Sequence, residues 1–416
     1  MDDDGDEWMD DLWRRISEND PNTDALEEDG DENYYIQTMT DENWEQLGHD
    51  IANNTHLTHV DLSLDALNDR KMSCFFRGLT RSSSIKEMAL YRNHLSVAGV
   101  RSMVPFLQHA NNLTHLNLDD NDLQSEGFNM LLRALRDSPI EMLYCCRCGI
   151  ESIEIDIEHA PRHLKELSLH DNNIDADGCR EAAKLLQGGD ATLESLNFSR
   201  NNINDEGVEI LVEALQSNKS LRELYLQKNG GISQRGKIML LKLVNDISSI
   251  EATLRSNHTL RNIILIPSDA DAQIHEKINM ATAINRLPEE AGRMKVIETQ
   301  LNSVKRAELV ELQGDNQSIY SEINPLHLPE VLALVGRCHG QGELFVALKS
   351  SIAEVISTVD RKECIKQENS YYSAKIAEYR AKMEANEAEL ATIEASEASV
   401  VNFGSESRCN KRRKAS

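Results

Sequence analysis

Residues 113–123 read LTHLNLDDNDL and residues 193–203 read LESLNFSRNNI, and both fit the frame L-x-x-L-x-L-x-x-N-x-L. The frame recurs at start-to-start spacings of 28, 28, 27, 24, 29, 28 and 39 residues, between copies that begin at Leu57, Ile85, Leu113, Ile140, Leu164, Leu193, Leu221 and, truncated, Leu260. Self-similarity at a period of about 20–50 residues is the signature of a repeat architecture, in which each unit packs on its neighbours. The sequence therefore predicts a solenoid rather than a series of separate globular domains.

Each regular copy continues into a helical pattern. A glycine six residues after the frame asparagine opens an apolar stretch at helical spacing, as at Gly99, Gly127, Gly178 and Gly207. The frame leucines are expected to fill a core between a parallel sheet and outer helices. The fourth copy differs, because residues 151–163 contain Pro161 and lack helical spacing. An extended or single-turn connection is predicted there.

The frame asparagine has its own predicted task, which is to satisfy backbone groups where the chain turns out of each strand. These residues are Asn93, Asn121, Asn172, Asn201 and Asn229, with Asp65 and Cys148 in their place in the first and fourth copies. Cys148 is therefore interpreted as structural rather than reactive.

The repeat resembles the ribonuclease-inhibitor type of leucine-rich repeat, which also occurs in the Ran GTPase-activating protein and in NOD-like receptors. The resemblance covers roughly residues 45–267, and the run from His327, HLPEVLALVGRCHGQGELFVAL, is similar to uncharacterised ribonuclease-inhibitor-like proteins of diatoms. It implies an α/β horseshoe solenoid with a parallel inner sheet and outer helices. Cysteine at the asparagine position occurs within this family.

Charge and pattern divide the rest of the chain. Residues 1–50 hold nineteen Asp or Glu against two Arg, a net charge of −17 out of −26 for the whole chain of 416 residues. The predicted domains are a disordered acidic tail at 1–39, the repeat domain at 40–267 closed by a helix over 40–54, a helical extension at 268–360, a long helix at 361–398 and a disordered basic tail at 399–416. The long helix has heptad-like spacing, and both a short coiled coil with a homodimer and a self-packed helix stay open.

The same composition excludes several functional classes. Seventy acidic against 44 basic residues argue against a nucleic-acid binder, and no apolar run approaches the length of a membrane span. Without a secretory signal pattern at the N-terminus, a cytoplasmic or nuclear location and reduced cysteines are expected. No nucleotide-binding loop, zinc-protease motif or nucleophile turn is present, so we expect no enzyme activity and no cofactor.

One spacing imitates a metal site. The spacing is close to that of a Cys2His2 zinc finger, and the residues are Cys145, Cys148, His159 and His163. The repeat register assigns Cys145 to the core and Cys148 to the turn, and Pro161 separates the histidines where a finger needs a helix. We therefore expect no metal at these residues.

The predicted strands alternate inward and outward, so their third, fifth, seventh and eighth positions form rows on a concave face. The eighth-position row reads Leu64, Arg92, Asp120, Arg147, Asp171, Arg200 and Lys228, with charges that alternate almost throughout. Two interpretations remain: a ladder of lateral ion pairs, or an interface in which neighbouring tyrosines anchor a protein partner. The candidate partner-binding residues are Tyr91, Arg92, His115, Asp119, Asp120, Tyr144, Arg147, His170, Asp171, Arg200, Tyr225 and Lys228.

Two candidate motifs lie outside the repeats. Trp8, Leu12, Trp13 and Ile16 follow helical spacing in the acidic stretch, as in a segment that folds into a partner's groove, or that docks on the chain's own helices. Lys411, Arg412, Arg413 and Lys414 resemble a nuclear localisation signal, or are a solvated basic end.

Taken together, these patterns predict a non-enzymatic scaffold whose concave face binds a protein partner. The alternative is a regulator of a small GTPase similar to the Ran GTPase-activating protein. That family carries its acidic tail after the repeats, whereas here the acidic stretch precedes them.

Overall fold

A computed structural model describes residues 4–27, 38–63, 67–158, 160–188, 190–266, 271–287, 291–300, 303–314 and 373. The chain divides into two compact units, Met1–Gln317 and Ser318–Ser416. All of the helices and strands given below belong to the first unit. The predicted long helix at 361–398, the basic tail at 399–416 and the extension beyond residue 314 lie outside the described residues, apart from residue 373.

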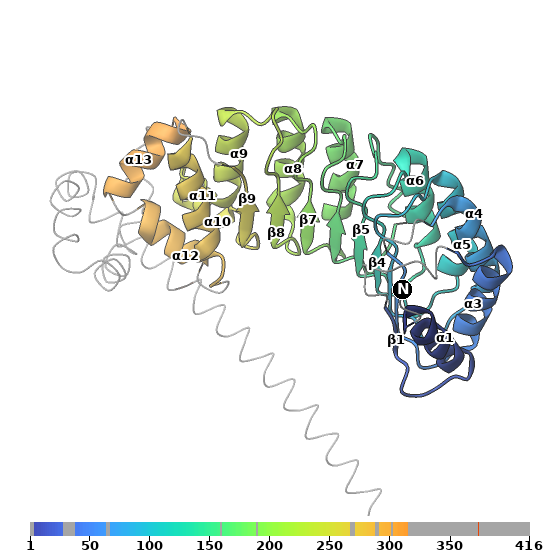
Figure 1. The fold of residues 1–416 in the computed structure, drawn as a ribbon. Helices are drawn as coiled ribbons and strands as arrows, with labels where there is room; N and C mark the ends of the chain where they lie inside the picture. The colour runs from blue at the N-terminus through green and yellow to red at the C-terminus, as the bar shows by residue number, and fades with distance from the viewer. Residues whose placement is uncertain are drawn as a thin grey trace, which may run out of the picture. The chain divides into compact units, whose positions relative to one another are not determined.

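Nine parallel strands of the described chain form one sheet in sequence order (Figure 1). They are β1 Ala25–Leu26, β2 His59–Asp61, β3 Glu87–Ala89, β4 His115–Asn117, β5 Met142–Tyr144, β6 Glu166–Ser168, β7 Ser195–Asn197, β8 Glu223–Tyr225 and β9 Asn262–Ile264. Frame leucines stand opposite one another, as Leu116 opposite Leu143 and Leu196 opposite Leu224. The predicted repeat register is therefore confirmed.

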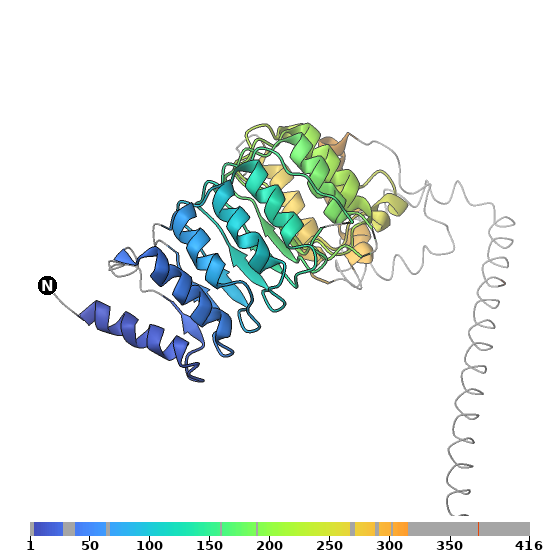
Figure 2. The same cartoon turned by 90° about the vertical axis from the view of Figure 1, so that its right-hand side faces the viewer.

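Helices lie along the other side of the unit from the strands (Figures 1 and 2). They are α1 Asp4–Ser17, α3 Asp41–Asn53, α4 Asp69–Gly78, α5 Val97–Leu107, α6 Gln124–Ala134, α7 Ala176–Leu186, α8 Asp205–Ser217, α9 Gln234–Val244, α10 Ile250–Arg255, α11 Ala272–Ile284, α12 Ala291–Lys295 and α13 Ser303–Gln313, with a π-helical turn at Val296–Gln300. The frame leucines and the helix leucines, for example Leu196, Leu211 and Leu215, are fully buried between the two layers. This is the α/β solenoid that the repeat predicts.

Local sequence sets where these helices begin and how closely they pack. Side chains such as Ser96, Asp175 and Asn204 accept hydrogen bonds from the first free backbone N–H groups of α5, α7 and α8. Helices α3 and α4 meet through two glycines, since a Cβ atom on Gly78 would lie 2.1 Å from the Glu45 carbonyl oxygen. The absence of a side chain at this point allows the two backbones to touch.

The frame asparagines form a buried ladder at the strand ends. Asn121 Nδ2 donates to the carbonyl oxygens of Leu90 (2.9 Å) and Leu118 (3.0 Å), and its Oδ1 accepts from the Leu95 N–H (3.1 Å). In the fourth copy the Cys148 thiol stands where the other copies have the asparagine Nδ2 donor, and its Sγ atom lies 3.2 Å from the Leu118 carbonyl oxygen. Burial raises the pKa of this thiol to about 12, so it stays a neutral donor. Cys148 is structural, as predicted.

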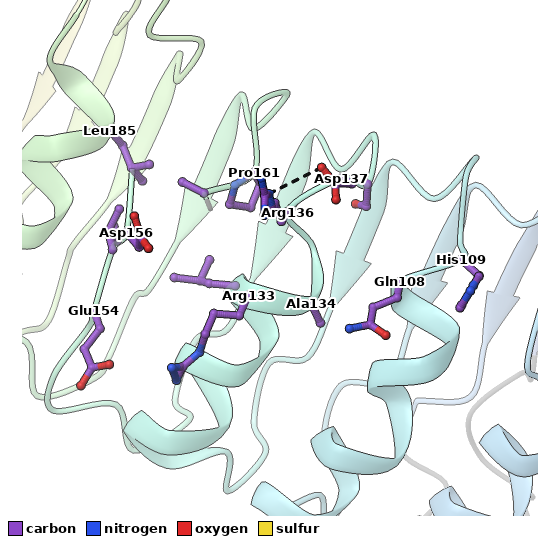
Figure 3. A pocket seen from close by; sticks show the side chains of 14 residues that line it. Gln108, His109, Arg133, Ala134, Arg136, Asp137, Glu154, Asp156, Pro161 and Leu185 are labelled. Carbon is purple, nitrogen blue, oxygen red and sulfur yellow. Dashed lines mark ion pairs between the residues drawn. The ribbon is translucent and has the colours of Figure 1, made fainter. Parts of the chain in front are cut away.

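In the fourth repeat, the described residues between β5 and β6 (145–158 and 160–165) contain no helix, as predicted. Its residues 151–156 form neither helix nor strand and are held by the neighbouring helices: the Glu154 N–H donates to Asn129 Oδ1 on α6 (2.9 Å), and the Ile155 N–H donates to Glu181 Oε2 on α7 (2.8 Å). A cavity of about 660 Å³ remains beside this segment (Figure 3). Its lining mixes apolar and charged side chains, including Ile155, Leu185 and Arg133.

The expectation of disorder over 1–39 is wrong for residues 4–27. Helix α1 packs against α3, where Met9, Leu12 and Ile16 are buried at 1%, 7% and 1% exposure, and β1 pairs with β2. The helical spacing was recognised in the sequence, and in the structure the apolar side of this amphipathic helix packs on a folded neighbour while Asp10 and Asp11 are exposed. The side chain of Trp8 lies outside the described residues. Of the two alternatives for this segment, docking on the chain's own helices is the one observed.

The predicted boundary at residue 267 does not end the first unit. Helix α11 packs against α9 and β9, and Asn285 Nδ2 donates to the carbonyl oxygens of Leu260 (2.6 Å) and Asn257 (3.1 Å). Asn257 and Asn218 do the same for the preceding turns, with Leu215 and Leu186 as acceptors. The helix-to-strand turn of the repeat thus continues into the helices after β9.

Candidate functional site

The strand register assembles rows of side chains on the face of the sheet opposite the helices. Third-position residues stand side by side, from His59 and Glu87 through His115 and Met142 to Glu166, Ser195, Glu223 and Asn262. We define the open sheet face as the third, fifth and seventh positions of the repeats at β2–β9. This is the face that the sequence predicts to be concave and partner-binding.

The eighth-position row lies where the chain leaves each strand. All six of its described residues have left-handed backbone, with φ between 51° and 61° at Arg92, Asp120, Arg147, Asp171, Arg200 and Lys228. This conformation is uncommon for residues other than glycine. It is held by lateral backbone hydrogen bonds, such as that from Asp120 N–H to the Cys146 carbonyl oxygen (2.8 Å). Leu64 lies outside the described residues.

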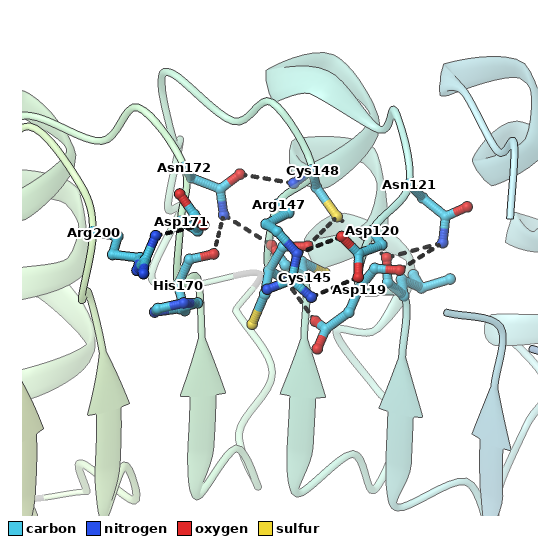
Figure 4. Close-up of polar contacts among 12 residues, drawn as sticks. Asp119, Asp120, Asn121, Cys145, Arg147, Cys148, His170, Asp171, Asn172 and Arg200 are labelled. Carbon is cyan, nitrogen blue, oxygen red and sulfur yellow. Dashed lines mark hydrogen bonds and ion pairs between the residues drawn. The ribbon is translucent and has the colours of Figure 1, made fainter. Parts of the chain in front are cut away.

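Four members of this row form ion pairs between neighbouring strands (Figure 4). The Arg147 guanidinium donates two hydrogen bonds to the Asp120 carboxylate, which lowers the pKa of that carboxyl group. Arg200 Nη1 lies 3.7 Å from Asp171 Oδ2. The ladder of lateral ion pairs thus accounts for these four residues. Arg92 and Lys228 are exposed and form no ion pair with another described residue.

A second charged row escaped the sequence reasoning. It occupies the second position of the frame, where Glu141 pairs with Lys165 (2.8 Å) and Glu194 pairs with Arg222 (3.4 Å). The alternation of Glu, Lys, Glu and Arg at this position of four successive copies was the available signal. These two rows flank the open sheet face, and four of their cations are already neutralised by neighbours.

The seventh-position residues Asp119, Cys146 and His170 follow three adjacent strands, β4, β5 and β6. Figure 4 shows Asp119 and His170 on either side of the Arg147 turn. Asp119 Oδ1 accepts a hydrogen bond from the Cys146 N–H (2.6 Å), and burial raises the pKa of the Asp119 carboxyl group. Burial also lowers the pKa of His170 and raises that of the Cys146 thiol to about 12. A thiol that remains protonated at neutral pH is a poor nucleophile, so Cys146 is not activated for nucleophilic attack.

The three candidate tyrosines lie on the open sheet face and are partly exposed. Tyr225 Oη donates to Glu223 Oε2 at 2.6 Å, and this bond together with burial raises the pKa of Tyr225 to about 12. Tyr144 Oη lies 3.4 Å from Met142 Sδ, and burial and the Glu166 carboxylate raise its pKa to about 12. Both phenols therefore stay neutral.

His115 is a candidate of a different kind, because the sequence places it in a row with His59 and Glu87. Its Nδ1 atom lies 2.8 Å from Thr114 Oγ1, and His59 Nε2 lies 3.3 Å from Glu87 Oε1. Across the described ranges, no group of three or more His, Cys, Asp or Glu side chains is arranged to hold a metal ion.

Two polar atoms on the open sheet face have no hydrogen-bond partner. They are Ser199 Oγ, in a residue with 0% exposure, and Gln227 Oε1. The two residues follow β7 and β8 at the seventh position of adjacent repeats. Sequence reasoning gave no indication of them.

The cysteines that imitate a zinc finger lie in separate environments. The Cys145 side chain is fully buried in the core, and Cys148 belongs to the asparagine ladder. Within the described residues Cys74, Cys145, Cys146, Cys148 and Cys179 are all buried free thiols. His159 lies outside the described residues.

Comparison with known proteins agrees with this repeat geometry. The family model described as "Leucine Rich repeat" matches residues 109–131, 160–181 and 189–212. Ribonuclease inhibitor from Sus scrofa is 28% identical over 199 residues, which cover 46% of this chain and 44% of the inhibitor. The chain carries leucine-rich repeats similar to those of ribonuclease inhibitor.

Other relatives of this leucine-rich repeat protein carry the same repeats in longer chains. NACHT, LRR and PYD domains-containing protein 5 from Homo sapiens is 26% identical over 207 residues, covering 46% of this chain and 17% of that protein. The chain thus spans less than half the length of these curated relatives. A solved structure of leiomodin-1 actin-binding site 2 covers 32% of this chain and 74% of its own at 17% identity, with a TM-score of 0.27, a similarity too low to bear on function. Among the described helices none is long and apolar enough to cross a membrane.

Proposed function

We propose that this leucine-rich repeat protein is a non-enzymatic scaffold that binds a protein partner on its open sheet face. The observation that carries the proposal is that three partly exposed tyrosines, Tyr91, Tyr144 and Tyr225, lie at β3, β5 and β8 on a face that the described helices leave uncovered. Tyrosine supplies a large contact area at a low cost in side-chain entropy and is enriched at protein interfaces. Ribonuclease inhibitor is named for its action on another protein, a ribonuclease, which supports the same mode of use.

The charge of the chain supports a protein rather than a nucleic acid as the partner. The formal net charge is −26, and the charged rows beside the open sheet face are partly neutralised by their own ion pairs. A nucleic acid needs a cluster of unpaired Lys and Arg to contact its phosphates.

The proposal is tested by comparing what the full chain and the double variant Tyr91→Ala/Tyr225→Ala retain in affinity purification. The variant should lose the partner while its thermal unfolding midpoint stays unchanged, because neither side chain belongs to the core. Exposed Glu213→Gln on α8 is the matched control and should retain the partner. Equal retention by both variants would contradict the proposal, and a large fall in the melting temperature would show that the tyrosines are structural.

The basic run Lys411–Lys414 supports a second, independent proposal about location. We infer that it acts as a nuclear import signal, because four consecutive cations match the short basic motifs that import receptors bind. Replacing the four residues by alanine should move a fluorescent fusion of the chain out of the nucleus without changing partner capture. An unchanged distribution would show that the run is an ordinary basic end.

A further inference from the structure

Strand β9 is the last strand of the sheet, and its outer edge has no partner strand in the described chain (Figure 1). Between two neighbouring strands, the second-position carbonyl oxygen accepts from the next strand and the sixth-position N–H donates to it. At β8, the Arg222 carbonyl oxygen accepts from the Asn262 N–H (3.0 Å), and the Leu226 N–H donates to the Ile264 carbonyl oxygen (2.9 Å). The same two groups of β9 would serve a tenth strand.

These backbone groups of β9 are unpaired. They are the Arg261 carbonyl oxygen and the Leu265 N–H, and neither forms a hydrogen bond with another described residue. Ile263 lies between two residues whose backbone groups face β8, so its own N–H and C=O groups face the open edge. A row of aligned, unpaired backbone groups is the template on which another chain can add a strand.

The two edges of the sheet differ in their protection against such pairing. Strand β1, at the opposite edge, has only two residues and lies between the exposed Asp24 and Glu27. Short length and charge are among the means by which proteins protect an edge strand. Strand β9 instead has isoleucine at its outward positions, where Ile264 is partly exposed and Ile266 is 50% exposed. The β9 edge therefore offers apolar surface to a neighbouring strand.

The charge beside β9 indicates what a tenth strand should carry. In the second-position row, Arg222 pairs with Glu194 on the preceding strand (3.4 Å). Arg261 comes next in this row, beside Arg222, and Arg286 reaches the same edge, where its Nη2 atom donates to Asn262 Oδ1 (3.0 Å). Neither Arg261 nor Arg286 forms an ion pair with another described residue. An acidic residue at the second position of an added strand would continue the alternation of charge.

Strand β7 shows how such a strand fits, because it adds to β6 from the same side. Lys165 stands at the second position before β6, and its carbonyl oxygen accepts from the N–H groups of Glu194 (2.7 Å) and Ser195 (2.9 Å). An acid thus follows a cation in this row with the backbones paired. A segment with the sequence of β7 would place its glutamate beside Arg261 in the same way.

We propose that the open edge of β9 binds an extended segment of a partner protein as a tenth parallel strand, with an acidic residue beside Arg261 and an apolar residue beside Ile266. Backbone hydrogen bonds would supply the affinity, and these two side-chain positions would supply the selectivity. The edge is separate from the tyrosines of the open sheet face. It is therefore a second interaction surface, whose failure would leave the proposed function intact.

Synthetic peptides test the inference on the full-length chain. The probe is a fluorescein-labelled copy of Ala191–Ser199 that carries Ser199→Val, and its binding is followed by fluorescence anisotropy at physiological salt. One comparison peptide has N-methyl groups on the backbone nitrogens of Ser195 and Asn197, which would face β9, and another carries Glu194→Lys. The N-methyl peptide should not bind, because it cannot pair with the edge. The Glu194→Lys peptide should bind about threefold to fivefold more weakly than the probe.

Protein variants and hydrogen exchange locate the bound peptide. Arg261→Glu should reverse the preference between the glutamate and lysine peptides, because it inverts the charge beside the added strand. Arg101→Glu, which makes the same change at an exposed position on α5, should leave the preference as it is. On the unmodified chain, the bound probe should slow amide exchange at Ile263 and Leu265 without changing exchange in β3. Each variant is first shown to keep the thermal unfolding midpoint of the unmodified chain.

Three outcomes would overturn the inference. Equal binding of the probe and the N-methyl peptide would mean that the peptide adheres through its side chains rather than as a strand. Unchanged exchange at Ile263 and Leu265 in the presence of bound probe would place the peptide elsewhere. Absence of binding by the probe would mean that the β9 edge does not accept a strand. In each case the capture experiment with Tyr91→Ala/Tyr225→Ala still decides the proposed function by itself.

Discussion

Trp13 Nε1 donates a 2.7 Å hydrogen bond to Asp50 Oδ2, and this bond ties α1 to α3 across 37 residues of sequence. The same contact surface includes Asn54 Nδ2, which donates to the Ile16 carbonyl oxygen at 2.9 Å. Helix α1 of the acidic N-terminal segment, together with α3, therefore covers the N-terminal end of the solenoid core.

Deleting residues 1–39 should lower stability, since it removes α1 and β1. Burial of one large apolar side chain contributes about 1.5–3 kcal/mol, and Met9, Leu12 and Ile16 are all buried. We expect the free energy of unfolding to fall by several kcal/mol in urea titrations. Arg14→Gln on the exposed side of α1 is the control and should change it by about 0–1 kcal/mol. A truncated chain with an unchanged unfolding midpoint would show that α1 does not stabilise the solenoid.

Leu196→Ala should destabilise the protein by about 2–5 kcal/mol, because it leaves a cavity in the core shared by three repeats. Denaturant unfolding measures the loss. A change below about 1 kcal/mol would mean that the neighbouring side chains close the space, contrary to the packing of Leu167 and Leu224 on either side.

Asn201→Ala should cost about 1–3 kcal/mol, since it leaves unpaired the Leu169 and Phe198 carbonyl oxygens and the Ile174 N–H. Asn201→Cys should cost less, because Cys148 donates to a strand carbonyl oxygen from the equivalent position in the fourth copy. Urea titration of the two variants side by side provides the test. A cysteine variant no better than the alanine variant would contradict this account of the ladder.

Lys295 predicts a pH dependence of stability. Its ammonium group is fully buried, donates to the Val244 and Asn257 carbonyl oxygens and to His258 Nδ1, and burial lowers its pKa to about 7. The unfolded chain, in which Lys295 has a pKa near 10.5, then binds more protons than the folded chain between these two values. Stability must therefore rise with pH in this interval, by at most about 1.4 kcal/mol per pH unit.

Lys295→Met removes the titrating group and serves as the reference for this effect. Between pH 7 and 9 the free energy of unfolding of the unmodified chain should increase relative to that of the variant, and below pH 6 the difference should be flat once titration of the neighbouring His258 is allowed for. A difference that does not change with pH from 7 to 9 would mean that Lys295 keeps its ordinary pKa.

Most of the sheet could be derived from the sequence because the frame repeats in register. Once Leu116 and Leu143 are assigned to the core, the period gives the neighbours of Asp120 on the adjacent repeats, Arg92 and Arg147, but not that Asp120 pairs with Arg147. The amphipathic helix around Leu12 could be predicted from the helical spacing of its apolar residues. Its packing against α3 could not, because that depends on the three-dimensional structure. The unpartnered oxygen of Ser199 was beyond prediction, since it depends on how neighbouring side chains fill the surface around it.

Because the fourth repeat lacks a helix, the repeats before it and the repeats after it are only weakly coupled in unfolding. Helices α5 and α6 pack on one another, as do α7 and α8, whereas α6 and α7 make no comparable contact. They are connected through the sheet and through residues 151–156. In a linear array, stability propagates by nearest-neighbour coupling, so the weakest interface decides how far an unfolding event spreads. Unfolding that starts at either end should stop at the fourth repeat. The repeats before it and the repeats after it should therefore exchange their amide hydrogens at different rates, although they share one continuous sheet.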